Sequence, residues 1–581
     1  METGRNSGSV GRQGGRAHRR GTGETALRLT LLCRYFHTLR HLRPVQVYGR
    51  LWFRLYRPRP DLRPAPPLRA GAGSWVGPLS GEPCLLGPTT FRFLDQTRTL
   101  VDAADWNRPD WDKLWLYNLH YFDDLNAERA KERQDWHRAL IARWIADNPP
   151  GHGNGWEPYP LSLRIVNWIQ WILAGHPPQS DWLDSLAIQA RYLARRLEWH
   201  LLGNHLFANA KALVHAGLFF AGPEAERWLI AGLRVLDRQL PEQILPDGGH
   251  FERSPMYHAI ILKDVLDLLN LAEVYSGRVG TSRTGWWRDA ASRMLDWLRA
   301  MTPPDGGIAF FNDAAFGIAS SLAELADYAG RLGISVPSTT LAESEENADL
   351  SPVILLSDSG YARLQAGPAV LLVDVGAIGP DYLPGHAHAD TLSFELSLFG
   401  QRIVVNSGTS CYGTGPERQR QRGTAAHSTL EVDGQNSSEV WGGFRVARRA
   451  RPLSLHWGKT VDGGWVECAH DGYRRLPGRV THWRRWTLSP TSLRIEDRLH
   501  GRYRRAIARL HLHPTIRAGL GGVANGWLEL PDGRHPCWNV ENSGGVRLAS
   551  STWHPRFGVS AANVRLEILC NSPETQLLIQ W

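Results

Sequence analysis

The sequence predicts an α+β protein of two large parts, a helical (α/α) toroid followed by an antiparallel β-sandwich. Three observations predict this architecture. Apolar residues recur at three- and four-residue spacings from about residue 105 to 335. After residue 352 the apolar period changes to two and remains so to the C-terminus. The segment between them, 337–352, is polar, acidic and poor in apolar residues, as expected of an interdomain linker.

Residues 1–40 are predicted to form a basic, flexible tail and a lead-in helix. Residues 1–25 are mainly Gly, Arg and Ser, which is typical of a disordered tail. The stretch 26–42, ALRLTLLCRYFHTLRHL, is apolar but interrupted by Arg, so it predicts a helix and not the core of a signal peptide. The Pro-rich segment 56–67 predicts an extended linker or wrap.

The positive charge of the chain is concentrated at its N-terminus. Residues 1–70 contain 15 Arg, no Lys and 3 acidic residues, a net charge of +12, whereas the whole chain carries +9. The remaining residues therefore sum to −3, and the chain as a whole does not indicate a nucleic-acid-binding protein. The basic segment itself can contact an anionic polymer or a membrane surface.

The domain 41–336 is predicted to be a helical toroid, because amphipathic segments alternate with Gly- and Pro-rich breaks such as GHGNG (151–155) and TPPDGG (302–307). The clearest helices are expected at 161–175, 182–199, 207–222, 226–240, 257–275 and 291–301.

The domain 353–581 is predicted to be an antiparallel β-sandwich, because its segments alternate apolar and polar residues between Gly, Asp and Pro turns. The clearest strands are expected at 361–367, 369–378, 392–405, 428–434, 492–501, 506–514, 527–533 and 564–570.

Several classes of protein are excluded by composition and motif. No apolar run is long enough to predict a transmembrane segment. The six Cys lie far apart with no CxxC pair, so a disulfide scaffold or a Cys-rich zinc site is not expected. There is no GxSxG elbow, no P-loop and no Rossmann fingerprint after a strand, so serine hydrolase, NTPase and dinucleotide enzyme lack support.

The densest group of chemically active residues is GHAHAD (385–390). On a strand, alternation would point His386, His388 and Asp390 to one face. The segment 391–406 predicts a hairpin around Gly400, which would bring Asn406 back near His388. Alternating His residues beside a carboxylate indicate a metal or acid/base site, although a sandwich surface also carries polar residues.

Two further groups lie in the helical domain. GNHLFANAKAL (203–213) places Asn204 and His205 where a helix begins, and Asn is also a common helix cap. PDGGHFERSPMYH (246–258) places Tyr257 beside acidic and basic residues, where a phenol can be held for proton transfer or simply pack. In that segment Arg253 and His258 predict positive charge near the phenol of Tyr257.

These segments together resemble the heparinase II/III-like polysaccharide lyases, over most of the chain from residue 115 to about 441. The resemblance is carried by the order and spacing of WLYNLHYFDDL, GWEPYPLSLRIVNWI, NHLFANAKAL, DGGHFERSPMYH, GHAHADTLSFEL, VVNSGTSCY and RGTAAHSTLEVDGQ. It implies an (α/α) toroid followed by an antiparallel β-sandwich, in agreement with the change of period.

The resemblance also implies roles for individual residues. Tyr257 and His386 match catalytic acid/base residues, and Asn204 and His205 match the pair that contacts the uronate carboxylate. The same segments supply candidate substrate-binding residues, namely Arg253, Glu252, Trp156 and Tyr159.

A structural zinc ion is implied on His388, Asn406 and His427. Because an amide oxygen is a weaker ligand than a carboxylate, a hydrogen-bonded cluster without metal is the alternative. No organic cofactor is expected.

The implied reaction is β-elimination on an acidic, uronate-containing polysaccharide or oligosaccharide, which leaves a 4,5-unsaturated uronate end. Asn204 and His205 would stabilise the enolate-like charge that forms when the C5 proton is removed. One alternative is a glycoside hydrolase on an α/α toroid, with paired carboxylates among Glu157, Glu252 and Asp247.

The other alternative is a non-catalytic glycan-binding protein of an exopolysaccharide pathway. Location also stays open: no signal peptide is visible, which favours the cytoplasm, whereas the resemblance implies the cell envelope or periplasm.

Overall fold

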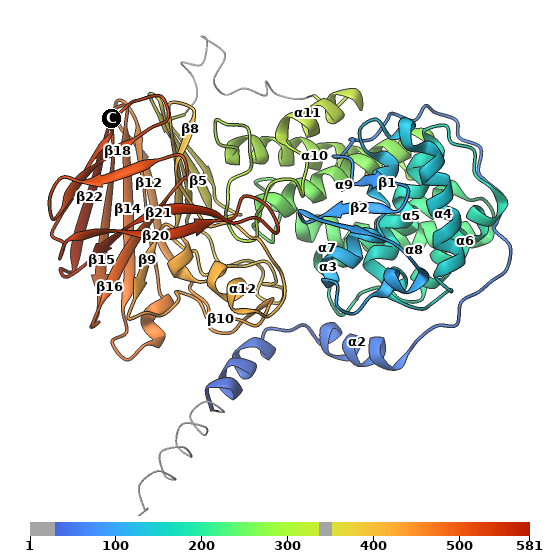
Figure 1. Cartoon of the computed structure of the whole chain (residues 1–581), viewed down its shortest axis with the longest axis horizontal. Coiled ribbons are helices and arrows are strands. Elements are labelled where there is room, and N and C mark those ends of the chain that lie inside the picture. Colours follow the sequence, from blue (N-terminus) through green and yellow to red (C-terminus); the bar gives the residue numbers. More distant parts are fainter. Residues whose placement is uncertain (1–28, 336–350) are drawn as a thin grey trace, which may run out of the picture.

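The chain was analysed as a computed structural model that describes residues 29–335 and 351–581. Helices dominate the first range, and antiparallel strands dominate the second. The two parts lie side by side, α2 (Pro44–Leu55) lies below the helical part, and the helix before it extends outward from below the sheet part (Figure 1). The predicted linker 337–352 lies outside the described residues except for its last two positions.

The N-terminal part is built mainly of helices whose bounds follow the predicted apolar periodicity. Residues 29–39 are helical. The later helices are α2 (Pro44–Leu55), α3 (Lys113–Leu119), α4 (Gln134–Asp147), α5 (Pro158–Leu173), α6 (Ser180–Ala194), α7 (Gly203–Phe219), α8 (Pro223–Gln243), α9 (Pro255–Val274), α10 (Thr281–Met301) and α11 (Leu322–Arg331).

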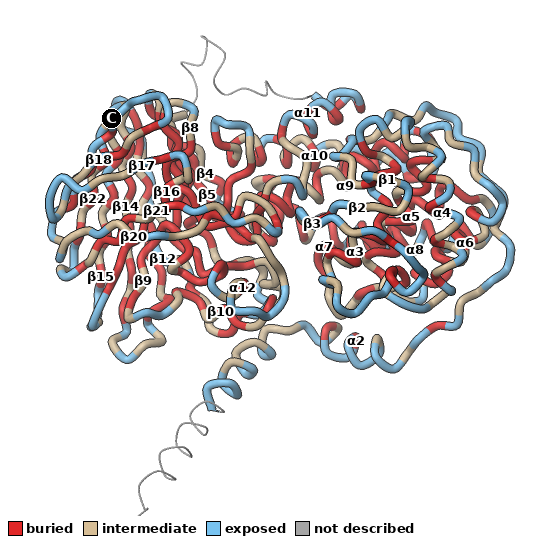
Figure 2. Tube along the Cα trace, in the orientation of Figure 1, coloured by how far each residue is buried: buried red, intermediate tan, exposed pale blue. Residues whose placement is uncertain are grey.

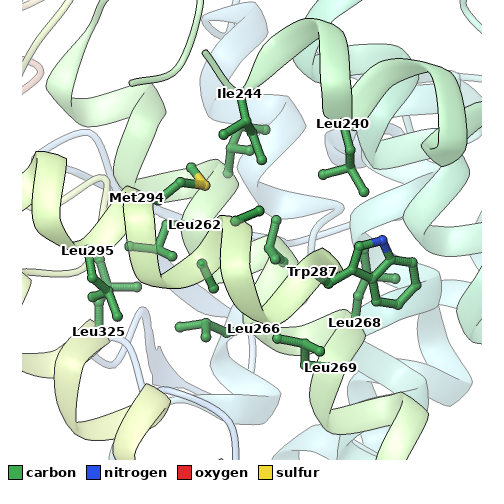
Figure 3. Close-up of a cluster of buried hydrophobic side chains, with 14 of the residues drawn as sticks. Leu240, Ile244, Leu262, Leu266, Leu268, Leu269, Trp287, Met294, Leu295 and Leu325 are labelled. Atoms are coloured by element: carbon green, nitrogen blue, oxygen red, sulfur yellow. The ribbon is translucent and has the colours of Figure 1, made fainter. Parts of the chain in front are cut away.

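One apolar core of this part forms where α8, α9, α10 and α11 meet (Figure 3). Leu262, Leu266 and Leu269 recur at four- and three-residue spacings, so one side of α9 faces Met294 of α10 and Leu325 of α11. Such burial stabilises each side chain by about 1.5–3 kcal/mol relative to exposure. The helices that carry the site are therefore fixed by an apolar core.

Two helix starts position the residues of interest. α9 begins at Pro255, and the Ser254 side chain accepts a hydrogen bond of 3.2 Å from the Tyr257 backbone N–H. α7 begins at Gly203, with Leu202 as the N-cap residue. Asn204 is thus not the cap, but lies with His205 in the first turn of α7.

The C-terminal part contains two large antiparallel sheets. Their strands are β4 (Val353–Leu356), β5 (Tyr361–Ala366), β6 (Ala369–Asp374), β7 (Phe394–Leu398), β8 (Gln401–Val405), β9 (Leu430–Val432), β12 (Pro452–Lys459), β13 (Gly464–His470), β14 (Thr481–Ser489), β15 (Ser492–His500), β16 (Ala506–Leu512), β17 (Arg517–Leu520), β18 (Asn525–Glu529), β19 (Cys537–Glu541), β20 (Val546–Trp553), β21 (Ala561–Leu569) and β22 (Glu574–Gln580). The first sheet runs β20-β21-β16-β8-β7-β6-β5-β4 with β9 beside β16, and the second runs β12-β13-β14-β15-β22-β19-β18-β17.

The first sheet lies between the second sheet and the helical part. Leu364 and Leu371 enter a core shared with Trp486 of the second sheet. Tyr361 and Leu372, which lie on the other face of the same two strands, enter the core of the helical part. Because side chains alternate along a strand, β5 and β6 contact both cores at once, and residues from the two parts of the chain are brought together.

The expected hairpin is confirmed: β7 pairs with β8, and Gly400 in the turn has a φ of 81°. One prediction is wrong, because GHAHAD lies in the loop between β6 and β7 and not on a strand. A small sheet of β1 (Leu85–Gly87), β2 (Thr90–Phe93) and β3 (Gln96–Thr99) was also not predicted, since such short strands give little periodic signal.

Candidate active site

The centre of the candidate site is the buried carboxylate of Asp313, in the loop after α10. His386 Nδ1 donates to it at 2.9 Å, His388 Nε2 at 2.8 Å and Arg418 Nη2 at 2.8 Å. Burial alone would raise the pKa of Asp313, but the charge of Arg418 and these hydrogen bonds hold it well below its ordinary value. Asp313 is therefore ionised, and it fixes the Nδ1–H form of His386.

Tyr257 lies directly against His386. Their ring centroids are 3.7 Å apart and the rings are nearly parallel. The Tyr257 hydroxyl lies 2.9 Å from the hydroxyl of Tyr412. Burial, followed by the nearby Tyr412 and Asp313, raises the pKa of Tyr257 well above 10. The phenol of Tyr257 thus keeps its proton at neutral pH.

A second group surrounds the first turn of α7. His205 Nδ1 lies 3.2 Å from Glu198 Oε1, and the Tyr159 ring centroid is 4.5 Å from that of His205. Burial alone would lower the pKa of His205, but the charge and hydrogen bond of Glu198 raise it above its ordinary value. The arrangement favours an imidazolium at His205, which suits contact with a carboxylate.

Glu252 connects the two groups. Its Oε1 accepts a long hydrogen bond of 3.4 Å from the Asn204 backbone N–H, and its Oε2 lies 3.5 Å from His386 Nε2. Burial raises the pKa of Glu252. The structure therefore gathers Tyr257, His386, Glu252, Asn204 and His205 from both parts of the chain.

The other candidates are held elsewhere. Trp156 is buried against Trp144 and Tyr192 in the helical core. The guanidinium of Arg253 donates to the backbone carbonyl of Ala377, which ties the helical part to the loop after β6. These positions explain both residues by packing or by backbone hydrogen bonding, and neither joins the gathered group.

The prediction that Arg253 and His258 supply positive charge beside Tyr257 is wrong. Arg253 bonds backbone carbonyl groups, and His258 Nε2 donates to the carbonyl of Met294 at 2.9 Å. Burial lowers the pKa of His258 to about 4, so it is neutral. The nearby cation is Arg418, whose guanidinium lies 5.0 Å from the Tyr412 ring centroid.

The residues expected to bind zinc make separate contacts: His388 and His427 face each other, whereas the side-chain oxygen of Asn406 is bonded to the backbone. His388 uses Nε2 to reach Asp313, and its Nδ1 lies 3.2 Å from His427 Nε2. The Asn406 side-chain oxygen accepts the Ser428 backbone N–H at 3.0 Å. Within residues 29–335 and 351–581, no group of three His, Cys, Asp or Glu side chains is placed to hold a metal ion. We therefore derive no chemical step through a metal.

Three members of the site were not singled out from the sequence: Asp313, Arg418 and Tyr412. Asp313 lies in FFNDAAF, a polar pair between apolar residues, and Tyr412 ends VVNSGTSCY. An isolated Asp within an apolar stretch is a usable signal, because a buried carboxylate needs partners. Its partners lie 73 and 105 residues away, however, so local spacing does not reveal them.

Family profiles match both parts of the chain. The sequence profile of the heparinase II/III N-terminus matches residues 128–330, and that of the heparinase II/III-like C-terminal domain matches residues 348–581. FtsZ-localized protein C of Caulobacter vibrioides is 27% identical over 87% of this chain and 88% of its own length. A heparin-sulfate lyase of Bacteroides stercoris is 27% identical over 41% of this chain and 37% of its own length.

Solved structures show the same fold. A heparinase III structure superimposes with a TM-score of 0.64 at 19% identity, covering 82% of this chain and 79% of the other. Heparan sulfate lyase from Pedobacter heparinus gives a TM-score of 0.57 at 17% identity, covering 85% and 81%. A helical part joined to an antiparallel sheet-rich part is the fold class that these heparinase structures share with this chain. Within that class, the chain belongs to the heparinase II/III-like family.

Proposed function

We propose that the protein cleaves a uronate-containing, acidic polysaccharide by β-elimination, leaving a 4,5-unsaturated uronate at one new end. The observation that carries the proposal is the contact of Tyr257 with His386, together with the bond from His386 to ionised Asp313. An acid and an oriented base thus lie side by side, as the reaction requires.

His386 is the proposed base. Because ionised Asp313 can only accept a hydrogen bond, His386 carries its proton on Nδ1 and keeps a lone pair on Nε2. That lone pair takes the C5 proton of the uronate, and the electrons of the C5–H bond form the C4=C5 double bond. Asp313 then stabilises the imidazolium that results.

Tyr257 is the proposed acid. Its raised pKa means that it enters the reaction protonated. As the C4–O bond breaks, the leaving oxygen keeps the bonding electron pair and takes the phenolic proton. A phenol that holds its proton is a poor base in the free enzyme, so His386 is the better base when the proton and the leaving group lie on opposite sides of the ring. The position of Tyr257 also suits proton removal and return when they lie on the same side.

The uronate carboxylate is proposed to meet His205 and Asn204 at the start of α7. A positive imidazolium and the N-terminal end of a helix both favour an anion. Negative charge that spreads onto the carboxylate as C5 loses its proton is stabilised there. Tyr159, stacked against His205, supplies an aromatic surface for a sugar ring.

The hydrolase alternative has less support, because its three carboxylates are bound separately. Glu157 pairs with Lys113 at 2.5 Å, and Asp247 accepts from the Ser359 hydroxyl at 2.8 Å. Glu252 faces His386. A glycosidase requires two carboxyl groups across one scissile bond, and no contact among the described residues joins any two of these three.

We also infer the finer architecture, a closed (α/α) toroid and a face-to-face sandwich, from the helix order and from the core that the two sheets share. The relatives' names make heparin-type uronates the first substrates to test, ahead of alginate-like and bacterial exopolysaccharide uronates. Purified protein should be screened against this panel by the ultraviolet absorbance of the conjugated product. Cleavage without that absorbance would favour the hydrolase, and binding without cleavage the non-catalytic glycan-binding protein.

A further inference from the structure

The N-terminal helices carry an unusual concentration of exposed apolar side chains. Of 24 exposed large apolar residues in the described chain, 11 lie within residues 29–55. Those on α2 are between 53% and 83% exposed. Exposed positions dominate α2 in Figure 2, where its tube is mostly pale blue. Scattered exposed apolar residues are ordinary, but a contiguous group indicates an interaction surface.

The exposed apolar residues of α2 share one side of the helix. Val47, Tyr48, Leu51, Trp52 and Leu55 span an arc of about 140° at 3.6 residues per turn. We call the outward side of residues 29–39 and α2 the N-terminal apolar face. On residues 29–39 it consists of Leu29, Leu31, Leu32, Tyr35, Phe36 and Leu39.

The opposite side of α2 and the C-terminal end of the helix at residues 29–39 contact the body of the protein. Gln46 Nε2 donates to the Tyr382 carbonyl at 3.1 Å, and the Phe53 ring centroid lies 4.1 Å from that of His200. Trp441 Nε1 donates to the hydroxyl of Thr38 at 3.1 Å, which anchors the first helix. The apolar face is therefore held outward, because the docking side is already occupied.

Positive charge accompanies this face. Residues 29–60 contain seven Arg and no Asp or Glu. Arg50 and Arg54 follow one border of the apolar arc on α2, and both are exposed. The complementary partner must offer an apolar layer beneath negative charge.

We propose that the N-terminal apolar face binds the surface of an anionic lipid bilayer. Leu, Val and Trp side chains enter the boundary of the acyl chains, and the bordering Arg pair with lipid phosphates, as in interfacial amphipathic helices. A polysaccharide would not cover aliphatic side chains such as Leu51 and Leu55. None of the helices in the described ranges is both long and apolar enough to span a bilayer, so this contact lies along the surface.

The test is cosedimentation of the full chain with phosphatidylcholine vesicles, with and without phosphatidylglycerol. The chain should sediment with the anionic vesicles, and less at high salt. The double variant Leu51→Glu/Trp52→Glu should weaken binding at least about tenfold, since two inserted side chains are lost. The matched control Leu520→Glu/Val523→Glu alters exposed apolar residues of the sheet part and should bind as the unaltered chain does.

Both double variants should keep the activity of the unaltered chain on soluble polysaccharide, which shows that they fold. If Leu51→Glu/Trp52→Glu fails to fold, Trp52→Ser replaces it and should still weaken binding. Failure of the unaltered chain to sediment with anionic vesicles at low salt would overturn the proposal. So would a dimer in light scattering that becomes monomeric in the variant, because the face would then join two copies.

Discussion

The replacement Tyr257→Phe tests the assignment of the acid most directly. It keeps the ring against His386 and removes one hydroxyl. In the structure that hydroxyl makes a hydrogen bond of 2.9 Å to the Tyr412 hydroxyl. The loss should lower the free energy of unfolding by about 1 kcal/mol, the typical net value of one such bond.

Turnover should respond far more strongly than stability. A general acid contributes about 10²–10⁴ in rate, which corresponds to about 3–5 kcal/mol in the activation barrier. The assay is the initial rate of ultraviolet absorbance on the best substrate of the uronate panel. We expect kcat to fall at least about a hundredfold while substrate binding changes little, because the hydroxyl acts on the leaving oxygen.

Tyr412→Phe is the matched control, because it removes the same hydrogen bond from the other side. The two variants should lose similar unfolding free energy, measured by denaturant titration. If Tyr257→Phe retained near-normal turnover, or if Tyr412→Phe were the more damaging of the two, the acid would not be Tyr257. Loss of turnover that Tyr257→Phe shares with global unfolding would instead identify a packing residue.

The remaining predictions address the base, the anion site and the metal. Asp313→Asn removes the charge that fixes the His386 tautomer, so kcat should fall by two or more orders of magnitude, up to about 10⁴-fold; a rate within tenfold of the unaltered enzyme would reject the pair. Burial alone would lower the pKa of His205, but Glu198 raises it. The contact between His205 and Glu198 therefore stabilises the folded protein fully below pH about 6.5, and this stabilisation is lost as the pH rises through the raised pKa of His205. Glu198→Gln should therefore shift the alkaline limb of kcat/KM to lower pH, and an unmoved limb would contradict the role of His205. His388→Ala should lower stability and remove any bound zinc together, and elemental analysis of active protein that finds no zinc would reject the metal.

Local patterns predicted much of the fold. The helix at 257–275 was expected from apolar spacing and is found at Pro255–Val274, and the hairpin around Gly400 is present. Both depend on residues close in sequence, where period and turn chemistry act directly. The sheet at 85–99 was missed, because strands of three or four residues carry too few alternations to distinguish them from loops.

The site was predicted less completely, because its contacts are long-range. His386 and His388 do converge, but on Asp313 of the helical part rather than on the face of a strand. Arg253 was expected to influence Tyr257 from four residues away, yet its side chain extends to the carbonyl of Ala377. Sequence spacing restricts where a side chain begins, whereas its partner is set by how the two parts of the chain pack.

His386 is placed between two carboxyl groups whose environments push their pKa values apart. Asp313 faces Nδ1 of His386 and is held ionised by the neighbouring Arg418. Glu252 faces Nε2 of His386, and burial raises the pKa of Glu252. Because burial raises the pKa of Glu252, this carboxyl group gives up its proton less readily than an exposed one, which reduces its repulsion of the uronate carboxylate. Opposed pKa shifts around a single titratable group are what an acid/base site requires, and a purely glycan-binding surface has no need of them.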